Sequence, residues 1–171
     1  MKKARTLLLS ALVAGMVLTG CQKETNDELE SYKESMDSFY NKLSYFDESI
    51  NGIDPNSDEA VSQLLGYLDE MNEEYKKMSE LTIPEEFSGI SDIAVEAADY
   101  MEMANQFYHE AYDNEFDGDS ESLAGQYYQR ANSRVLVMLQ VLHGEVPTGE
   151  GVTVTTQDSI QFSTIGTSTE E

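Results

Sequence analysis

The sequence is poor in several residue types. It has no tryptophan, one cysteine and three prolines, and its 10 lysines and arginines face 33 aspartates and glutamates. A single cysteine excludes a disulfide within the chain, so the fold depends on its core alone. The formal net charge of −23 excludes nucleic acid as a partner, because phosphate binding needs basic patches. Electrostatic attraction to an anionic membrane surface is disfavoured for the same reason.

The N-terminus has the pattern of an export signal. Three basic residues, Lys2, Lys3 and Arg5, precede an apolar run over residues 7–18. A basic segment followed by a short apolar one is typical of secretion, and the run is shorter than the about 20 residues that span a membrane unassisted. It ends in the tetrapeptide Leu18-Thr19-Gly20-Cys21. This tetrapeptide resembles the lipobox of bacterial lipoproteins.

The resemblance implies a defined modification. A diacylglyceryl group with acyl chains such as palmitate is attached through the sulfur of Cys21, and a signal peptidase cleaves between Gly20 and Cys21. Residues 1–20 are then the signal and residues 21–26 a short lipidated linker. Cleavage removes three basic residues and no acidic one, which lowers the net charge from −23 to −26. The protein is expected on the outer face of the cytoplasmic membrane, or in the periplasm of a host with an outer membrane, held by its lipid.

Residues 27–144 contain four segments with apolar residues at helical spacing. The first ends at Asn51-Gly52, the second runs from the N-cap Ser57 to Pro84, the third starts between Pro84 and Ser88, and the fourth runs from the N-cap Ser120 to Gly144. Short connections predict antiparallel neighbours. We therefore predict an all-α fold, an up-down-up-down four-helix bundle made of two helical hairpins. The alanine-rich third segment predicts close packing against a neighbour.

Residues 145–171 differ from the rest because they are rich in threonine, serine and glycine. This composition predicts a disordered tail. The alternation Val152-Thr153-Val154 could form a short strand, but the predicted bundle offers nothing that would pair with it.

The segment between the last two helices resembles a calcium loop in part. Asp113, Asp117, Asp119 and Glu121 have the spacing of EF-hand ligands, and Gly118 suits the sharp turn. Ala124 occupies the position at which an EF-hand loop has its bidentate glutamate, so the coordination sphere is incomplete. The preferred interpretation is a solvated acidic loop, with a weak calcium site as the alternative.

Two metal motifs fail at one residue each. His109-Glu110 begins the zinc motif H-E-x-x-H, but its fifth residue is Asp113, and the chain's other histidine is His143. Di-iron bundles use Glu-x-x-His pairs, whereas the residues three before the histidines are Gln106 and Gln140. We therefore predict no catalytic residues, no cofactor and no enzymatic activity, since nucleophile and phosphate-loop motifs are also missing.

The tyrosines divide into two groups. Tyr32, Tyr75, Tyr108 and Tyr128 fall on the apolar seams and are expected in the core, while a second group falls off the seams: Tyr45, Tyr67, Tyr100, Tyr112 and Tyr127. The second group either widens a buried helix face or anchors a partner or a sugar. The helical part resembles the small bundle lipoproteins of bacteria, a resemblance that carries no site residues. The main hypothesis is a lipid-anchored, non-enzymatic domain that binds another macromolecule, such as a basic protein; the alternative is a receptor for a small ligand or calcium.

Overall fold

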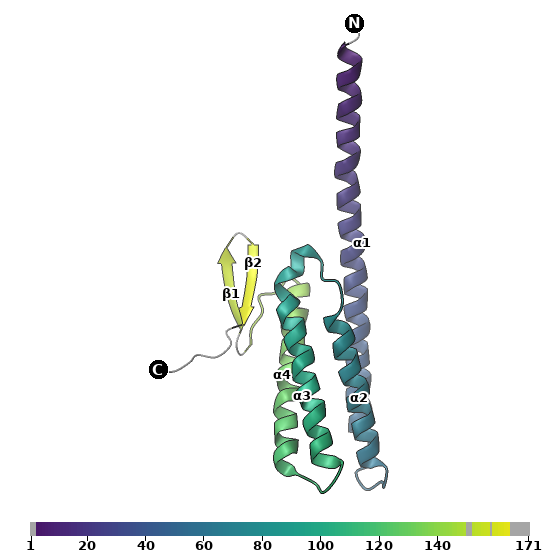
Figure 1. The fold of residues 1–171 in the computed structure, drawn as a ribbon, viewed down its shortest axis with the longest axis vertical. Coiled ribbons are helices and arrows are strands. Elements are labelled where there is room, and N and C mark those ends of the chain that lie inside the picture. The colour runs from purple at the N-terminus through teal and green to yellow at the C-terminus, as the bar shows by residue number, and fades with distance from the viewer. Residues whose placement is uncertain (1–2, 150–151, 158, 165–171) are drawn as a thin grey trace, which may run out of the picture.

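The structure, a computed structural model, describes the backbone of residues 3–149, 152–157 and 159–164, and the side chains of residues 27–149. Its helical elements are α1 (Lys3–Asn51), α2 (Ala60–Ser79), the 3-10 helix η1 (Glu85–Ile90), α3 (Ser91–Tyr112) and α4 (Gly118–Leu142). Each long helix packs against the next and runs antiparallel to it (Figure 1). The predicted up-down-up-down four-helix bundle is confirmed.

The first helix begins earlier than the sequence pattern predicted. It starts at Lys3 instead of Asp27 and extends well beyond the other three helices (Figure 1). Residues 21–26, expected as a short linker, continue this helix. Leucine and alanine dominate residues 3–20, and both are strong helix formers. In the part of the chain searched, which is limited to described residues, no helix has the length and apolar character needed to cross a membrane.

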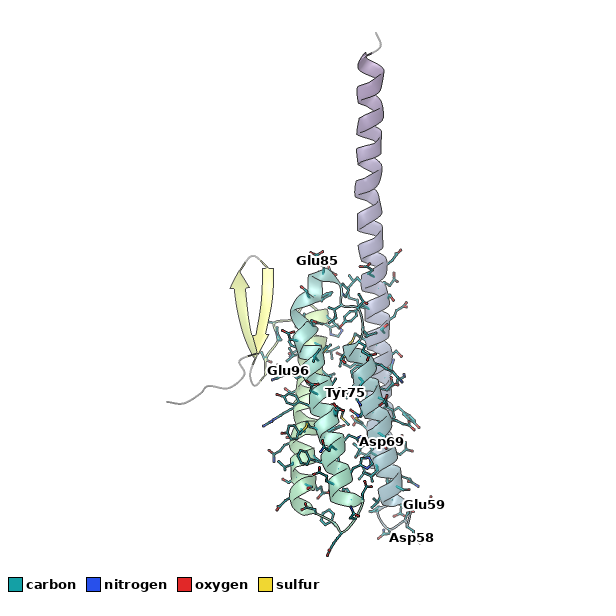
Figure 2. All side chains as sticks on the ribbon, in the orientation of Figure 1. Asp58, Glu59, Asp69, Tyr75, Glu85 and Glu96 are labelled. Atoms are coloured by element: carbon teal, nitrogen blue, oxygen red, sulfur yellow. The ribbon has the colours of Figure 1, made fainter. Side chains whose placement is uncertain are left out.

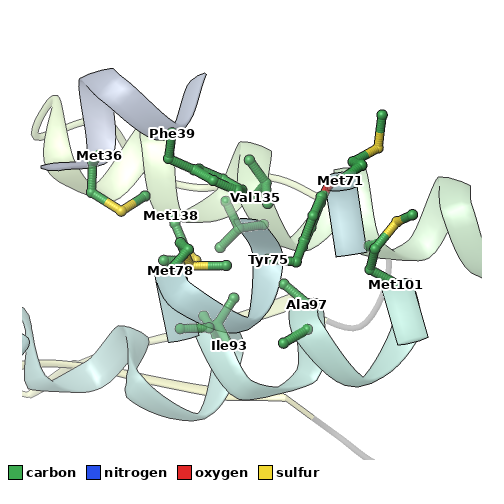
Figure 3. Packing of buried hydrophobic residues seen from close by; sticks show 14 of the residues in the cluster. Met36, Phe39, Met71, Tyr75, Met78, Ile93, Ala97, Met101, Val135 and Met138 are labelled. Carbon is green, nitrogen blue, oxygen red and sulfur yellow. The ribbon is translucent and has the colours of Figure 1, made fainter. Parts of the chain in front are cut away.

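The four apolar seams meet in one core. Tyr75 of α2 lies at its centre and is fully buried, with the ring of Phe39 of α1 edge-on at 5.2 Å (Figures 2 and 3). Methionines from all four helices surround it: Met36, Met71, Met78, Met101 and Met138. The apolar spacing of the second segment includes Val61, which lies in the first turn of α2, is 40 % exposed and is not part of this core.

Helices α3 and α4 are the most closely packed pair in the described bundle. Alanines at their contact are fully buried, among them Ala97 and Ala104 of α3 and Ala124 and Ala131 of α4. Small side chains allow two helix axes to approach, since nothing bulky separates the backbones. The expectation that the alanine-rich segment packs closely against a neighbour is confirmed, and that neighbour is α4.

Two predicted N-caps lie elsewhere. Helix α2 begins at Ala60, and the Ser57 hydroxyl instead accepts the backbone N–H of Glu59 at 3.2 Å, within the preceding turn. The N-cap of α4 is Asp117 instead of Ser120, because its carboxylate accepts both the Asp119 N–H and the Ser120 hydroxyl. An aspartate at the helix start also suits the positive end of the helix dipole.

The C-terminal segment contains a β-hairpin. Strands β1 (Val152–Gln157) and β2 (Ser159–Thr164) pair antiparallel, with Val154 opposite Phe162. The structure therefore differs from the expected disordered tail over these two strands. Threonine, valine and isoleucine favour extended backbone. The predicted bundle offered no partner for a strand at residues 152–154, and the structure pairs this strand with the following one, β2.

Candidate functional sites

Three of the four carboxylates of the candidate calcium loop are engaged with the protein itself. Asp113 contacts the His109 ring at 3.0 Å, and Asp117 caps α4. Glu121 accepts a short hydrogen bond from the Tyr112 hydroxyl. Among the described residues, no group of three or more histidine, cysteine, aspartate or glutamate side chains is arranged to hold a metal ion. Calcium binding by Asp113, Asp117, Asp119 and Glu121 stays a prediction, without a gathered ligand set to support it.

His109 joins two helices. Its Nδ1 lies 3.0 Å from an Asp113 oxygen and its Nε2 lies 3.0 Å from Asp69 of α2, which also accepts the Asn105 amide. Partial burial disfavours the charged ring, but the hydrogen bonds and charges of Asp113 and Asp69 outweigh it and raise the pKa of His109 above 6.5. The residue singled out as half a zinc motif therefore links α2 to α3.

The residues of the failed di-iron motif also have local roles. Gln106 donates to Glu110 within α3, and the Gln140 side chain accepts the backbone N–H of Thr148. His143 is exposed at the C-terminal end of α4. His109 and His143 therefore lie on different helices, and the glutamine that precedes each of them has a partner of its own.

A cleft of about 390 Å³ opens between α1 and α4, near the end of the bundle that carries the α1–α2 and α3–α4 loops. We call it the α1–α4 cleft. Its apolar lining comes from Ile50, Leu64 and Leu68. Its polar lining comes from α1, α3 and α4: Asp47, Asn51, Tyr108, Tyr128 and Asn132. An apolar surface with a few convergent polar groups is typical of ligand sites.

A chain of hydrogen bonds leads from the core to this cleft. The Tyr75 hydroxyl donates to Asn132 Oδ1 at 2.7 Å, the Asn132 amide hydrogen-bonds Tyr128, and the Tyr128 hydroxyl donates to Asp47 Oδ1 at 2.7 Å. A second hydrogen bond also joins α1 to α4. The Tyr40 hydroxyl of α1 donates to the Val135 carbonyl of α4 at 3.2 Å. Tyrosines thus span the α1–α4 boundary.

The two phenol groups in this series of hydrogen bonds, those of Tyr75 and Tyr128, keep their protons at neutral pH. Burial raises the pKa of Tyr128 to about 12, where the hydrogen bond to Asn132 acts in the opposite sense and Asp47 adds to the rise. Burial raises the pKa of Tyr75 further, with the Tyr128 and Asp47 charges adding to it. Both hydroxyls therefore act as donors, and the carboxylate of Asp47 is the acceptor at the end of the chain.

A second feature lies on the outer side of the α3–α4 pair. The Phe107 and Tyr127 rings stack at 5.6 Å with an interplanar angle of 9°, and Tyr100 lies 6.2 Å from Tyr127. All three rings are half-buried. Arg130 lies over two of them, 5.4 Å from the Tyr127 centroid and 5.9 Å from that of Tyr100.

Arg134 completes this surface. Its guanidinium lies 5.8 Å from the Tyr100 centroid, and its Nε donates to Glu96 at 2.6 Å. Glu96 lies on the side of the bundle away from α1 (Figure 2). We call the surface formed by Tyr100, Phe107, Tyr127, Arg130 and Arg134 the α3–α4 face. Leu123, one turn before Tyr127 on α4, extends it and is 40 % exposed.

Sequence reasoning identified Tyr100 and Tyr127 as off-seam residues but missed the arginines and Phe107. The available signal was charge. Residues 122–144 contain no aspartate or glutamate, in a chain with 33 of them, and Arg130 and Arg134 are the only arginines after Arg5. After its first turn, which holds Asp119 and Glu121, helix α4 has no acidic residue in an otherwise acidic protein, and both of its arginines lie on the α3–α4 face.

The expected division of the tyrosines into core and off-seam groups is confirmed in part. Tyr32 and Tyr75 are buried, as predicted, whereas Tyr108 and Tyr128 are half-buried and line the cleft. Tyr45 is 57 % exposed, with the Tyr67 ring edge-on at 6.5 Å. Comparison with family models, curated proteins and solved structures gave no match to this chain. A proposal about the function of this chain therefore rests on its geometry and its sequence.

Proposed function

We propose that this chain is a lipid-anchored, non-enzymatic domain of the bacterial cell envelope that binds another macromolecule through its α3–α4 face. The observation that carries the proposal is the composition of that face. Three aromatic rings and two arginines gather on the α3–α4 pair, and residues 122–144, which form most of α4, contain no acidic residue. Tyrosine, phenylalanine and arginine are enriched at the centres of protein interfaces, and aspartate and glutamate are depleted there.

The anchor in this proposal is the lipid on Cys21. The lipobox residues Leu18-Thr19-Gly20-Cys21 support it, and α1 is continuous through position 21. After cleavage the helix would rise from the lipid at about 1.5 Å per residue, which keeps the bundle close to the membrane. Two acyl chains give stable anchoring where one is marginal.

The anchor is tested by metabolic labelling with palmitate in a bacterial host. The chain should incorporate the label and mature to a shorter product, because the lipid is attached before cleavage. Cys21→Ser should lose the label and leave the precursor uncut. Label that persists in Cys21→Ser would overturn the lipid anchor while leaving the α3–α4 face untouched.

The face is tested by photo-cross-linking in intact envelopes. A photoreactive residue at Leu123 should give a discrete adduct of higher mass, because that side chain is exposed beside the aromatic rings. The matched control carries the same residue at Glu70, which is exposed on α2. The adduct should disappear in Arg130→Glu. An adduct common to both positions, or one indifferent to Arg130, would contradict binding through this face.

A further inference from the structure

The α1–α4 cleft has a donor and acceptor pattern that selects its ligand, independently of the α3–α4 face. The Tyr128 and Tyr75 hydroxyl protons are committed to Asp47 Oδ1 and Asn132 Oδ1. Asp47 retains its second carboxylate oxygen as an acceptor at the cleft. Asn51 and Tyr108 also line the cleft and can donate as well as accept. The open acceptor at Asp47 needs a ligand group that donates hydrogen bonds.

The charge of the cleft points the same way. Among the ion pairs of residues 27–149, none includes Asp47, and Lys42, five residues earlier on α1, pairs with Glu74 instead. The net charge of the chain is −23, and a field of that sign raises the local concentration of cations. A cationic ligand therefore meets an attractive field and a carboxylate without a basic partner.

The lining separates an organic cation from a metal ion. Calcium takes six to eight oxygen ligands, several of them carboxylates, and the cleft supplies the one carboxylate of Asp47 beside amides and phenols. Its remaining wall is aliphatic, from Ile50, Leu64 and Leu68. Aliphatic walls suit an apolar body, and the rings of Tyr108 and Tyr128 suit a neighbouring ammonium group through cation–π attraction.

We propose that the α1–α4 cleft binds a small organic cation, with a primary ammonium group on Asp47 and an apolar body against Ile50, Leu64 and Leu68. An ammonium group carries three donors and one charge, which matches the acceptors left open at the cleft. Its charge-assisted hydrogen bond to Asp47 is the strongest single contact. The apolar body distinguishes this ligand from a simple inorganic cation, which would leave the aliphatic wall unused.

The test uses 2-phenylethylammonium as the probe and its neutral isostere 2-phenylethanol as the control. Each is titrated calorimetrically into the full chain in detergent at about 0.15 M salt, where long-range attraction is screened. Methyl NMR of isoleucine and leucine reports the place of binding. We expect saturable binding of the amine with shifts at Ile50, Leu64 and Leu68, and at least about tenfold weaker binding of the alcohol.

The variants separate the cleft from the general charge of the protein. Asp47→Asn keeps an acceptor for Tyr128 but removes the charge, and should weaken amine binding by about tenfold or more. Asp47 and Glu48 are both exposed, but only Asp47 lines the cleft, so Glu48→Gln removes the same charge outside the site and should leave binding unchanged. Equal weakening in both variants, equal binding of the alcohol, or shifts away from the cleft would each overturn the proposal. Circular dichroism of both variants checks that the bundle is intact.

Discussion

At the scale of single residues, Tyr75 joins the core to the polar boundary between α1 and α4. Its ring is fully buried, and its hydroxyl reaches Asn132 at 2.7 Å. A buried hydroxyl is tolerated only when it is paired, because desolvation without a partner is costly. The same residue therefore supplies apolar contact through its ring and orients the amide that contacts Tyr128.

Tyr75→Phe should lower the free energy of unfolding by about 1 kcal/mol, because it keeps the ring and leaves the Asn132 oxygen without its donor. Urea denaturation measures the change. Tyr45→Phe is the control, since Tyr45 is exposed and should tolerate the loss of its hydroxyl. Equal stability of Tyr75→Phe and the parent chain would show that water replaces the bond without cost.

His109 makes the α2–α3 contact depend on pH. Its pKa is raised in the folded state by Asp113 and Asp69, against the effect of burial. The contribution of the charged ring is complete below pH about 6.5 and disappears as the pH rises through the raised pKa. The urea midpoint should fall across that window, and His109→Asn should remove this fall. His143→Asn should retain it, and loss of the pH dependence in that variant instead would contradict the assignment.

At the scale of elements, the α3–α4 hairpin is the closest helix pair and owes this to its alanines. Ala97, Ala104 and Ala131 have no exposed surface. Close backbone approach leaves no space for a larger side chain, and interiors at crystal-like density respond even to one added methylene. The spacing of the rings and arginines on the α3–α4 face depends on this approach.

Ala97→Leu should therefore cost about 1–3 kcal/mol in unfolding free energy, the range for overpacked cores. Thermal unfolding followed by circular dichroism measures it. Val95→Leu on the same helix is the control, because Val95 is 48 % exposed and has room for the change. A neutral Ala97→Leu would mean that α3 and α4 can move apart without loss.

The loop between α3 and α4 is held by its own carboxylates. Asp117 caps α4, and the Ser120 hydroxyl and Asp119 N–H lower its pKa. Asp117→Ala should lower the melting temperature through the lost cap. The decrease should be the same with and without calcium, measured by scanning fluorimetry with a tyrosine signal. A melting temperature of the parent chain that rises with calcium, and does so only while Asp117 is present, would revive the calcium alternative.

At the scale of the whole molecule, the dominant property is its negative charge. The net charge of −23 becomes −26 if residues 1–20 are removed. Like charges on one compact body repel one another and favour expanded states, and salt reduces that repulsion. Cation-binding tests on this protein therefore need controls that separate a site from the general field.

The melting temperature should rise when sodium chloride is increased from about 0.01 M to 0.15 M, because the screening length falls from about 30 Å to 8 Å. Potassium chloride should give the same rise, since screening depends on ionic strength alone. A rise with one of the two salts only would indicate a bound ion in place of screening.

The four long helices and the ends of α1 and α4 could be predicted from the sequence alone. These depend on local physics: apolar spacing selects the buried face, and Asn51-Gly52 and Gly144 end α1 and α4 through their own backbone preferences. The end of the second helix was predicted too late, because α2 ends at Ser79 and Pro84 instead precedes the 3-10 helix η1. The cap at Asp117 and the start of α1 were misplaced, because several neighbouring residues could serve and the contacts made in the fold choose among them.

The positions of the candidate sites depend on how the helices pack together. Tyr128 and Asp47 are 81 residues apart, and Tyr75 and Asn132 are 57 apart, so no local pattern could pair them. The α3–α4 face likewise needs two helices side by side before rings and arginines meet. Helical periodicity states which side of each helix is buried. It does not state which polar groups from different helices converge, because that depends on the crossing and depth of the packed helices.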